Sequence, residues 1–137
     1  MAPVQKNFQA EQILFNEGDP SHSLYIMRKG TVAIRKKKGK TFVEVGRIYA
    51  NEVIGELSFF DRQPRSAAAV ALTDIEVLEI SFDSMEKIYA SIPDYMKTFM
   101  AALAERLRKA NEQIRKLKDN TLSEEDLKKA ATPEEKD

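Results

Sequence analysis

Two short motifs in the middle of the chain combine residue types that could bind a phosphate group. The first is Gly-Glu-Leu-Ser at residues 55–58, and the second is Pro-Arg-Ser-Ala at residues 64–67. Gly55 lets a ligand approach the backbone closely, and a short helix after it would point unpaired N–H groups at an anion. Arg65 adds a planar cation whose N–H groups suit phosphate oxygens. Together the motifs predict a phosphate site.

Glu56 lies within this predicted site and does not suit a plain phosphate, because a carboxylate repels anions. It does suit a ligand that also presents a hydroxyl donor, as a ribose does. An anion, a hydroxyl and a glycine-lined backbone together indicate a nucleotide. The residues leave one alternative open, which is an ion pair between Glu56 and Arg65 that bridges a loop.

Other reactive groups are scarce in the sequence. The chain has no cysteine and a single histidine, His22, which we expect to be a solvated turn residue. No group of histidines and carboxylates has the spacing of a metal site, and no serine or histidine forms a convincing nucleophile–base pair. We therefore predict neither a bound metal nor an enzyme.

Composition and charge narrow the class of protein further. The 137 residues are 42% hydrophobic, which suits one compact domain, and 22 basic residues balance 22 acidic ones. A net charge of zero gives no general attraction to nucleic acid or acidic lipid. The N-terminus lacks the apolar segment of a signal peptide, and no run approaches the roughly 18 apolar residues that span a bilayer. We expect a cytoplasmic protein without nucleic-acid or membrane partners.

The first two-thirds of the chain consist of short apolar runs separated by turn residues. Such frequent short strands predict an antiparallel β-sandwich or jelly-roll barrel rather than a parallel sheet. The basic run at residues 35–40 is expected to be the solvated tip of a hairpin. The predicted strands are residues 11–15, 24–27, 31–34, 41–45, 67–72 and 76–80.

The last third changes to a helical pattern, so the predicted fold class is α+β. Ser81 or Asp83 can cap a short helix over residues 82–90, and Pro93 can open a long helix over residues 94–118. We expect a barrel with its hinge helix at 1–92, a long lid or dimerisation helix at 93–118, and an acidic, flexible tail at 119–137.

Apolar residues of the long helix recur at alternating steps of four and three, which is a heptad pattern. The helix could lie against the domain core, or it could pair with a second copy. The flanking positions lack complementary charges, yet the unbroken repeat favours a homodimer. The repeat consists of Met96, Met100, Leu103, Leu107, Ala110, Ile114 and Leu117.

The two motifs and the order of elements resemble the cyclic-nucleotide-binding domain family. This family includes protein kinase A regulatory subunits, cyclic-nucleotide-gated channels and catabolite activator proteins. Its phosphate-binding cassette reads Gly-Glu-Leu-Ala/Ser, several variable residues, and then Pro-Arg-Ala/Thr/Ser-Ala, as residues 55–67 do here. Gly18-Asp19, the run 24–26 and Gly30 also resemble the family's early strands. The resemblance extends over about residues 10–118.

The resemblance implies a role for each residue of the cassette. Glu56 would accept a hydrogen bond from the ribose 2′-hydroxyl, and Arg65 would pair with the cyclic phosphate. The backbone N–H groups of Ser58 and Ala67, with the main chain of Gly55 and Leu57, would complete the cradle.

The residues leave the identity of the base open. Ser66 lies where the family discriminates cAMP from cGMP, but a hydroxyl there can serve either the phosphate or a guanine. Val45 would contact the base or sugar. Asn51 replaces a glycine that is common in the family, and asparagine tolerates the left-handed conformation that such a turn needs. We favour cAMP over cGMP and leave a cyclic dinucleotide open.

The predicted function is a cyclic-nucleotide sensor that relays occupancy through its C-terminal helices to an unidentified effector protein. A ligand-free dimerising scaffold of the same fold is the alternative, although intact Glu56 and Arg65 argue against it. A DNA-binding regulator like the catabolite activators would need a further domain after the long helix, and residues 119–137 are too few to supply one.

Overall fold

The structure is a computed structural model that describes residues 3–120. The chain divides into two compact units, residues 1–98 and 99–137. All the strands among residues 3–120 lie in the first unit, together with two short helices and the start of the long helix. Residues 121–137 of the predicted acidic tail lie outside the described residues.

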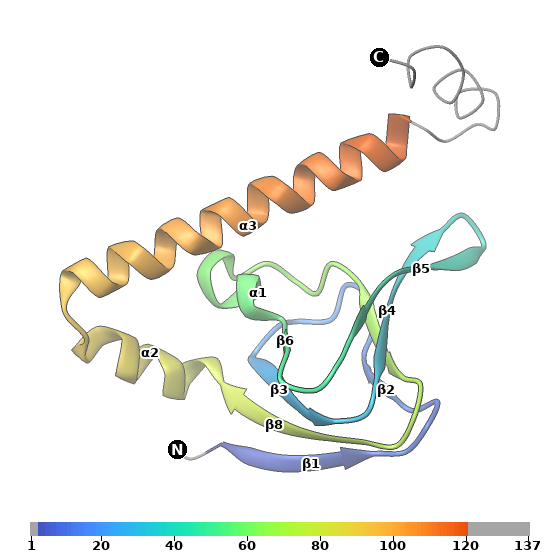
Figure 1. Ribbon diagram of the computed structural model, residues 1–137, viewed down its shortest axis with the longest axis horizontal. Helices are drawn as coiled ribbons and strands as arrows, with labels where there is room; N and C mark the ends of the chain where they lie inside the picture. Colours follow the sequence, from blue (N-terminus) through green and yellow to red (C-terminus); the bar gives the residue numbers. More distant parts are fainter. Residues whose placement is uncertain (1–2, 121–137) are drawn as a thin grey trace. The chain divides into compact units, whose positions relative to one another are not determined.

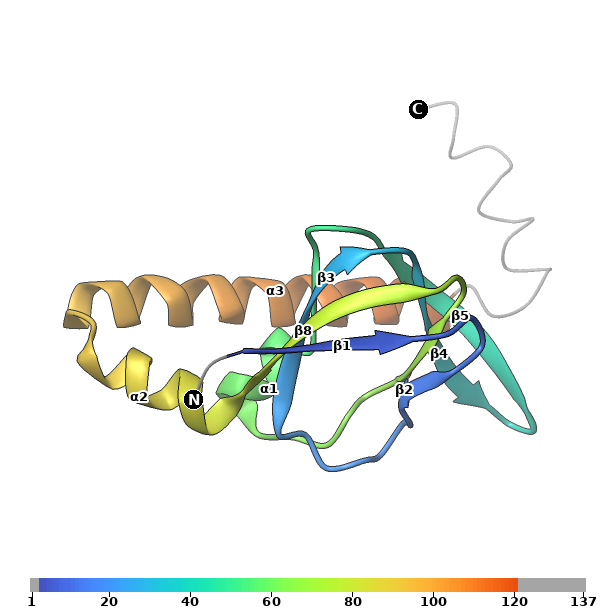
Figure 2. The same cartoon turned by 90° about the horizontal axis from the view of Figure 1, so that it is seen from below.

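Two four-stranded sheets form the first unit, and all strand pairs are antiparallel. Figures 1 and 2 show the chain passing repeatedly between the sheets. One sheet has the order β1 (Val4–Phe8), β8 (Ile75–Ser81), β3 (Ser23–Lys29) and β6 (Val53–Ile54). The other has the order β2 (Ile13–Phe15), β7 (Ala68–Ala71), β4 (Val32–Lys38) and β5 (Thr41–Ile48). The predicted antiparallel sandwich is confirmed.

The main core lies between these sheets. Met27 and Val77 are paired across β3 and β8, and both are fully buried, as is Val32 of β4. Ala69 and Ala71 of β7 are also fully buried, and their small side chains allow close packing of the strands around them. Alternation of inward and outward residues along the strands produces this core from the sequence.

A second apolar cluster connects the first unit's two short helices, α1 (Glu56–Asp61) and α2 (Phe82–Ser91). Its buried members are Leu24, Phe59 and Phe82. Ser81 caps α2, because its hydroxyl accepts a hydrogen bond from the Ser84 N–H at 3.1 Å; of the two predicted caps, Ser81 and Asp83, it is Ser81 that caps the helix.

Strand β1 was missed at the sequence level. Its sequence shows no alternation of apolar and polar side chains, and four of its five residues are exposed. It is an edge strand, held by pairing with β8 from Val4 opposite Glu79 to Phe8 opposite Ile75. The predicted strand over residues 11–15 is shorter in the structure, because Glu11 has a φ of 76° and β2 begins at Ile13.

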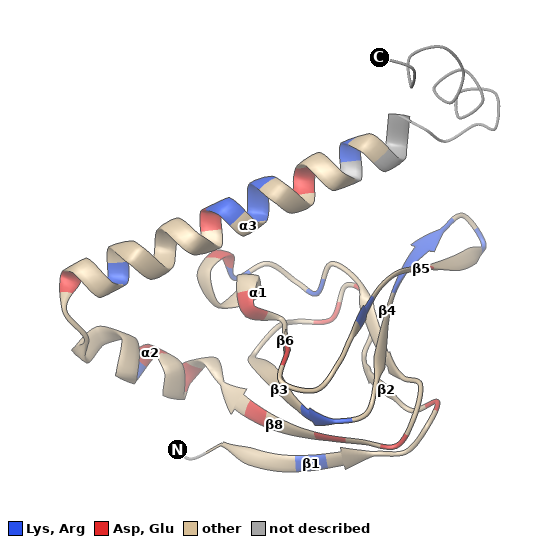
Figure 3. Ribbon diagram, viewed as in Figure 1, with Lys and Arg blue, Asp and Glu red and all other residues tan. Residues whose placement is uncertain are grey.

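The basic run forms the β4–β5 hairpin, as predicted, with Gly39 at its turn (Figure 3). Lys37, Lys38 and Lys40 are exposed there. The long helix is α3 (Asp94–Asn120), which begins directly after Pro93. Within residues 3–120, no helix is long and apolar enough to cross a membrane.

Candidate functional site

The structure brings the two predicted motifs together around Gly55 and Arg65. Gly55 precedes α1 with a φ of 90°, a left-handed conformation that favours glycine. A Cβ atom at this position would also collide with the Nη1 atom of Arg65. Glycine is therefore required both by the backbone and by the arginine that packs against it.

Arg65 is anchored from several directions and is only 6% exposed. Its Nη2 donates to the Ser23 carbonyl at 2.7 Å, and its guanidinium carbon lies 4.1 Å from the centroid of the Phe15 ring. The backbone is held as well, because the Arg65 N–H donates to the Asp19 carbonyl and the Arg65 carbonyl accepts from the Gly18 N–H. The position of this cation is thus fixed by two strands, β2 and β3, and by the turn between them.

Two nitrogens of this side chain, Nε and Nη1, are buried and have no hydrogen-bond partner among residues 3–120. A buried unpaired donor on a charged group is costly, so such groups mark sites that take a ligand. Burial lowers the pKa of Arg65, and the charges of Tyr25, Glu79 and Asp19 oppose this effect. The arrangement suits an oxyanion beside Gly55.

Glu56 stands in the first turn of α1 and is half-buried. Burial raises its pKa, while a hydrogen bond from its own backbone N–H opposes that rise. The alternative ion pair with Arg65 is not found, because within residues 3–120 the Arg65 side chain bonds only the Ser23 carbonyl, and its Nε and Nη1 are unpaired. A partly desolvated carboxylate next to the anion site can accept a hydrogen bond from a hydroxyl donor.

The remaining predicted residues lie on three elements. Leu57 and Ser58 follow Glu56 in α1, whose first N–H groups have no acceptor within the helix and no side-chain cap. Ser66 is exposed and Ala67 is buried, and both lie just before β7. Val45 is half-buried at a bulge in β5, and its contact with a base stays a prediction.

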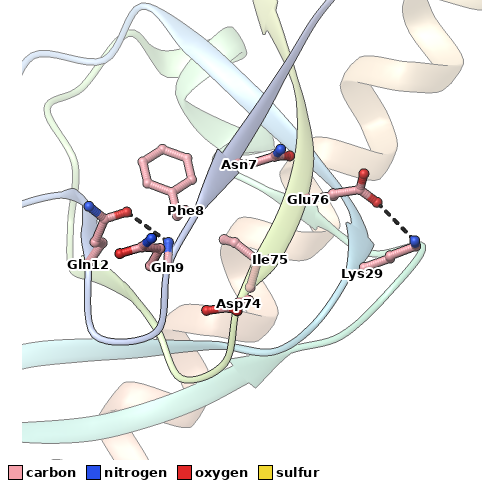
Figure 4. Close-up of a pocket in the computed structure, with 8 residues that line it drawn as sticks. All are labelled: Asn7, Phe8, Gln9, Gln12, Lys29, Asp74, Ile75 and Glu76. Carbon is pink, nitrogen blue, oxygen red and sulfur yellow. Dashed lines mark hydrogen bonds and ion pairs between the residues drawn. The ribbon is translucent and has the colours of Figure 1, made fainter.

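A separate hollow of about 570 Å³ lies between β1, the turn that follows it, and the start of β8. Figure 4 shows Phe8 and Asp74 among the residues that line it, together with an ion pair between Lys29 and Glu76. None of its lining residues belongs to the two motifs. Within residues 3–120, no group of three or more metal-ligating side chains could hold a metal ion, and His22 is exposed.

Comparison with known families shows which family the chain belongs to. The family model described as "Cyclic nucleotide-binding domain" matches residues 5–91. The chain belongs to this family. The buried Arg65 nitrogens and the glycine beside them lie within the matched residues.

Known members of the family resemble the chain in sequence and in structure. The CRP-like cAMP-activated global transcriptional regulator of Mycobacterium tuberculosis is 29% identical over 109 residues, which are 79% of this chain and 49% of that protein. The chain spans about half the length of the curated relatives it matches. The crystal structure of Thermus thermophilus catabolite activator protein has a TM-score of 0.69 and 27% identity, over 84% of this chain and 55% of that one.

The EAL enzyme Bd1971 contains a similar domain. Its cAMP-bound form has a TM-score of 0.66 and 29% identity, and its cGMP-bound form has a TM-score of 0.68 and 26% identity. Each match covers 87% of this chain and 32% of that protein. The similarity therefore concerns only part of Bd1971.

Three contributors to the site were not found from the sequence. Phe15 and the Ser23 carbonyl contact Arg65, and Arg62 ends α1 in a left-handed conformation with a φ of 56°. Only Arg62 had a local signal, since it precedes the second motif by two residues, but an arginine does not suggest a left-handed residue. The left-handed turn predicted at Asn51 is confirmed, with a φ of 73°.

Proposed function

We propose that the chain is a cyclic-nucleotide sensor, not an enzyme, which binds cAMP or cGMP and signals occupancy through α2 and α3. The observation that carries the proposal is the buried, incompletely paired guanidinium of Arg65 beside Gly55. This cation is already desolvated and oriented, so binding an anion does not require the side chain to be ordered first.

Each cassette residue has a part in this binding mode. The free nitrogens of Arg65 donate hydrogen bonds to the exocyclic oxygens of the cyclic phosphate. Glu56 accepts a hydrogen bond from the ribose 2′-hydroxyl. The N–H groups of Ser58 and Ala67, with the main chain of Gly55 and Leu57, surround the phosphate.

We favour cAMP as the ligand, with cGMP as the second candidate. Solved forms of Bd1971 hold either nucleotide, so a domain of this kind accepts both bases. The names of the curated relatives specify activation by cAMP. The exposed hydroxyl of Ser66 can bond either ligand, and it does not decide between them.

Calorimetric titration with cAMP, cGMP and cyclic di-GMP tests the function and identifies the base. The expected result is one cAMP per chain, with weaker binding of cGMP and none of the dinucleotide. Linear 5′-AMP is the matched control, because it has the same base and ribose but an open, more highly charged phosphate. Absence of binding by any cyclic nucleotide would contradict the proposal and favour a dimerising scaffold.

The route from the cassette to the C-terminal helices begins with aromatic contacts. The ring centroid of Phe59 in α1 lies 5.7 Å from those of Phe82 and Tyr89 in α2, and the rings meet edge to face. The ring centroids of Phe60 and Tyr89 are 6.0 Å apart. The Tyr89 hydroxyl donates to the carbonyl of Lys97 in the first turn of α3. A shift of α1 on nucleotide binding would therefore be transmitted to α2 and to the start of α3.

Arg62 adds a polar connection between α1 and α2. Its guanidinium lies 5.4 Å from the centroid of Phe59 and 5.1 Å from that of Phe82, and it is paired with Glu86 of α2. Because left-handed backbone costs a non-glycine residue about 1 kcal/mol or more, the side chain must have contacts that offset this strain.

Arg62→Gly is expected to leave nucleotide affinity within about threefold and stability within about 1 kcal/mol, because relief of the backbone offsets the lost contacts. The movement of α2 on nucleotide binding, which we call its response, should fall by about half or more, because one of the connections between α2 and α1 is removed. The response can be read from a fluorophore on Ile88→Cys, which is 65% exposed and would be the sole cysteine of the chain.

The control for this prediction is a pair of changes on one helix. Glu86→Gln removes the partner of Arg62 and should reduce the response, whereas Lys87→Gln changes a neighbouring charge and should not. A full response in Arg62→Gly would show that the aromatic contacts transmit the signal without it.

We also propose that α3 forms a homodimer with a second copy through its heptad residues. Leu103, Leu107, Ile114 and Leu117 are between 36% and 66% exposed in the single chain. Apolar side chains spaced by three and four residues form one stripe of the helix, and burial of this stripe stabilises helix pairs.

Leu107→Asp is expected to convert a dimer into a monomer of 15.6 kDa, because it places a charge in the middle of the stripe. Sedimentation equilibrium measures the mass. Lys109→Asp is the matched control, since it introduces the same side chain at an exposed position outside the repeat and should leave the dimer intact. A dimer that persists in Leu107→Asp would exclude this stripe as the interface.

A further inference from the structure

Phe15 forms a face against which the guanidinium of Arg65 lies. The distance from the guanidinium carbon to the ring centroid is 4.1 Å, well within the range of a cation–π contact. Tyr25 stacks on Phe15 with centroids 6.0 Å apart and an angle of 23° between the rings, and it lies 5.9 Å from the same guanidinium. The cation is thus next to a pair of stacked rings.

Strand pairing holds Phe15 in this place. It is the last residue of β2 and lies opposite Ala69 of β7, the strand that begins three residues after Arg65. The ring is half-buried and packs against the main core. Its position is therefore set by the sheet and does not depend on a flexible loop.

Unlike the other partners of Arg65, a ring face leaves the N–H donors of the guanidinium free. The Ser23 carbonyl occupies Nη2, and a carboxylate in place of the ring would occupy further N–H groups. An aromatic face attracts the cation without accepting any of these hydrogen bonds. Nε and Nη1 consequently remain buried and available for a ligand.

We propose that Phe15 is a positioning residue for the phosphate, which holds the buried Arg65 cation and keeps its donors free for the cyclic nucleotide. This inference rests on the proposed function. An aliphatic residue of similar size would fill the space, but it would not attract the cation, and the guanidinium would lose its orientation.

The test is a double-mutant cycle between Phe15→Leu and Arg65→Gln, read as calorimetric affinity for cAMP. Phe15→Leu is expected to weaken binding about tenfold in the wild-type background and by less than about twofold in Arg65→Gln. Phe15→Tyr should bind like the wild type, because it keeps the ring face. Phe8→Leu is the matched control, since Phe8 is also a half-buried phenylalanine packed against the main core but has no contact with Arg65.

Each outcome has a separate meaning. Affinity within about twofold of wild type in Phe15→Leu overturns the inference, as does an equal loss in the Arg65→Gln background. An equal loss in Phe8→Leu also overturns it, because the effect would then come from core packing. Unchanged binding in Arg65→Gln alone overturns the cassette assignment itself. If Phe15→Leu does not fold, normal binding by Phe15→Tyr still supports the inference, and a tenfold loss there contradicts it.

Discussion

Arg65→Gln is expected to weaken cAMP binding by about a hundredfold or more, because the charge-assisted hydrogen bonds to the phosphate are lost. The free protein should not be destabilised to a similar extent. The substitution loses the bond to the Ser23 carbonyl, but it also removes a buried cation with two unpaired nitrogens, and these two effects offset each other. Calorimetry gives the affinity, and urea unfolding gives the stability of the same variant.

Arg28→Gln is the matched control, since Arg28 is an exposed arginine of β3 and its loss should change neither quantity. A hundredfold loss of affinity together with normal stability assigns the effect to the ligand. If Arg65→Gln binds cAMP as the wild type does, the site is not where we place it.

Glu56→Gln is expected to weaken cAMP binding by about tenfold or more, because a charged acceptor for the ribose hydroxyl becomes neutral. In the absence of ligand, the same substitution should make the folded protein more stable. Burial raises the pKa of Glu56 above the ordinary 4.5, so the folded state holds this proton more tightly than the unfolded chain does. As the pH rises from the pKa of Glu56 in the unfolded chain to its higher pKa in the folded protein, wild-type stability falls relative to that of the variant. Above the folded-state pKa, the difference in stability stays constant.

Urea unfolding at a series of pH values between about 4 and 8, with both proteins, measures that difference. The 2′-deoxy analogue of cAMP supplies the matched test of the hydroxyl, because it should bind the wild type and Glu56→Gln almost equally. A variant that discriminates cAMP from the deoxy analogue as strongly as the wild type would contradict the assigned role of Glu56.

That the two motifs meet could be predicted from sequence, because they are only a few residues apart. Gly55 is required by a left-handed backbone and by the arginine packed against it, and both requirements are local. The alternative of a Glu56–Arg65 ion pair could not be excluded at that stage, since it depends on how the loop places two side chains. The sequence also narrowed the cap of α2 to Ser81 or Asp83, because a capping bond spans only three residues, and the structure shows that it is Ser81.

Contacts between distant segments could not be predicted in this way. Phe15 and Arg65 are separated by 50 positions, and they meet because β2 pairs with β7 in a register that shifts between Ile13 and Phe15. Strand β1 has an exposed, polar sequence, and only its pairing with β8 makes it a strand. Arg62 is left-handed although arginine disfavours this conformation, and its contacts with α2 appear only in the folded protein.

Binding of a cyclic phosphate to the free nitrogens of Arg65 can be observed directly at its Nε–H group by ¹⁵N–¹H NMR. The signal is assigned as the one that disappears in Arg65→Gln. Saturating cAMP is expected to shift it downfield and slow its exchange with water, because the hydrogen of an unpaired donor becomes bonded to a phosphate oxygen. An Nε–H signal that stays unchanged while cAMP binds would contradict the account.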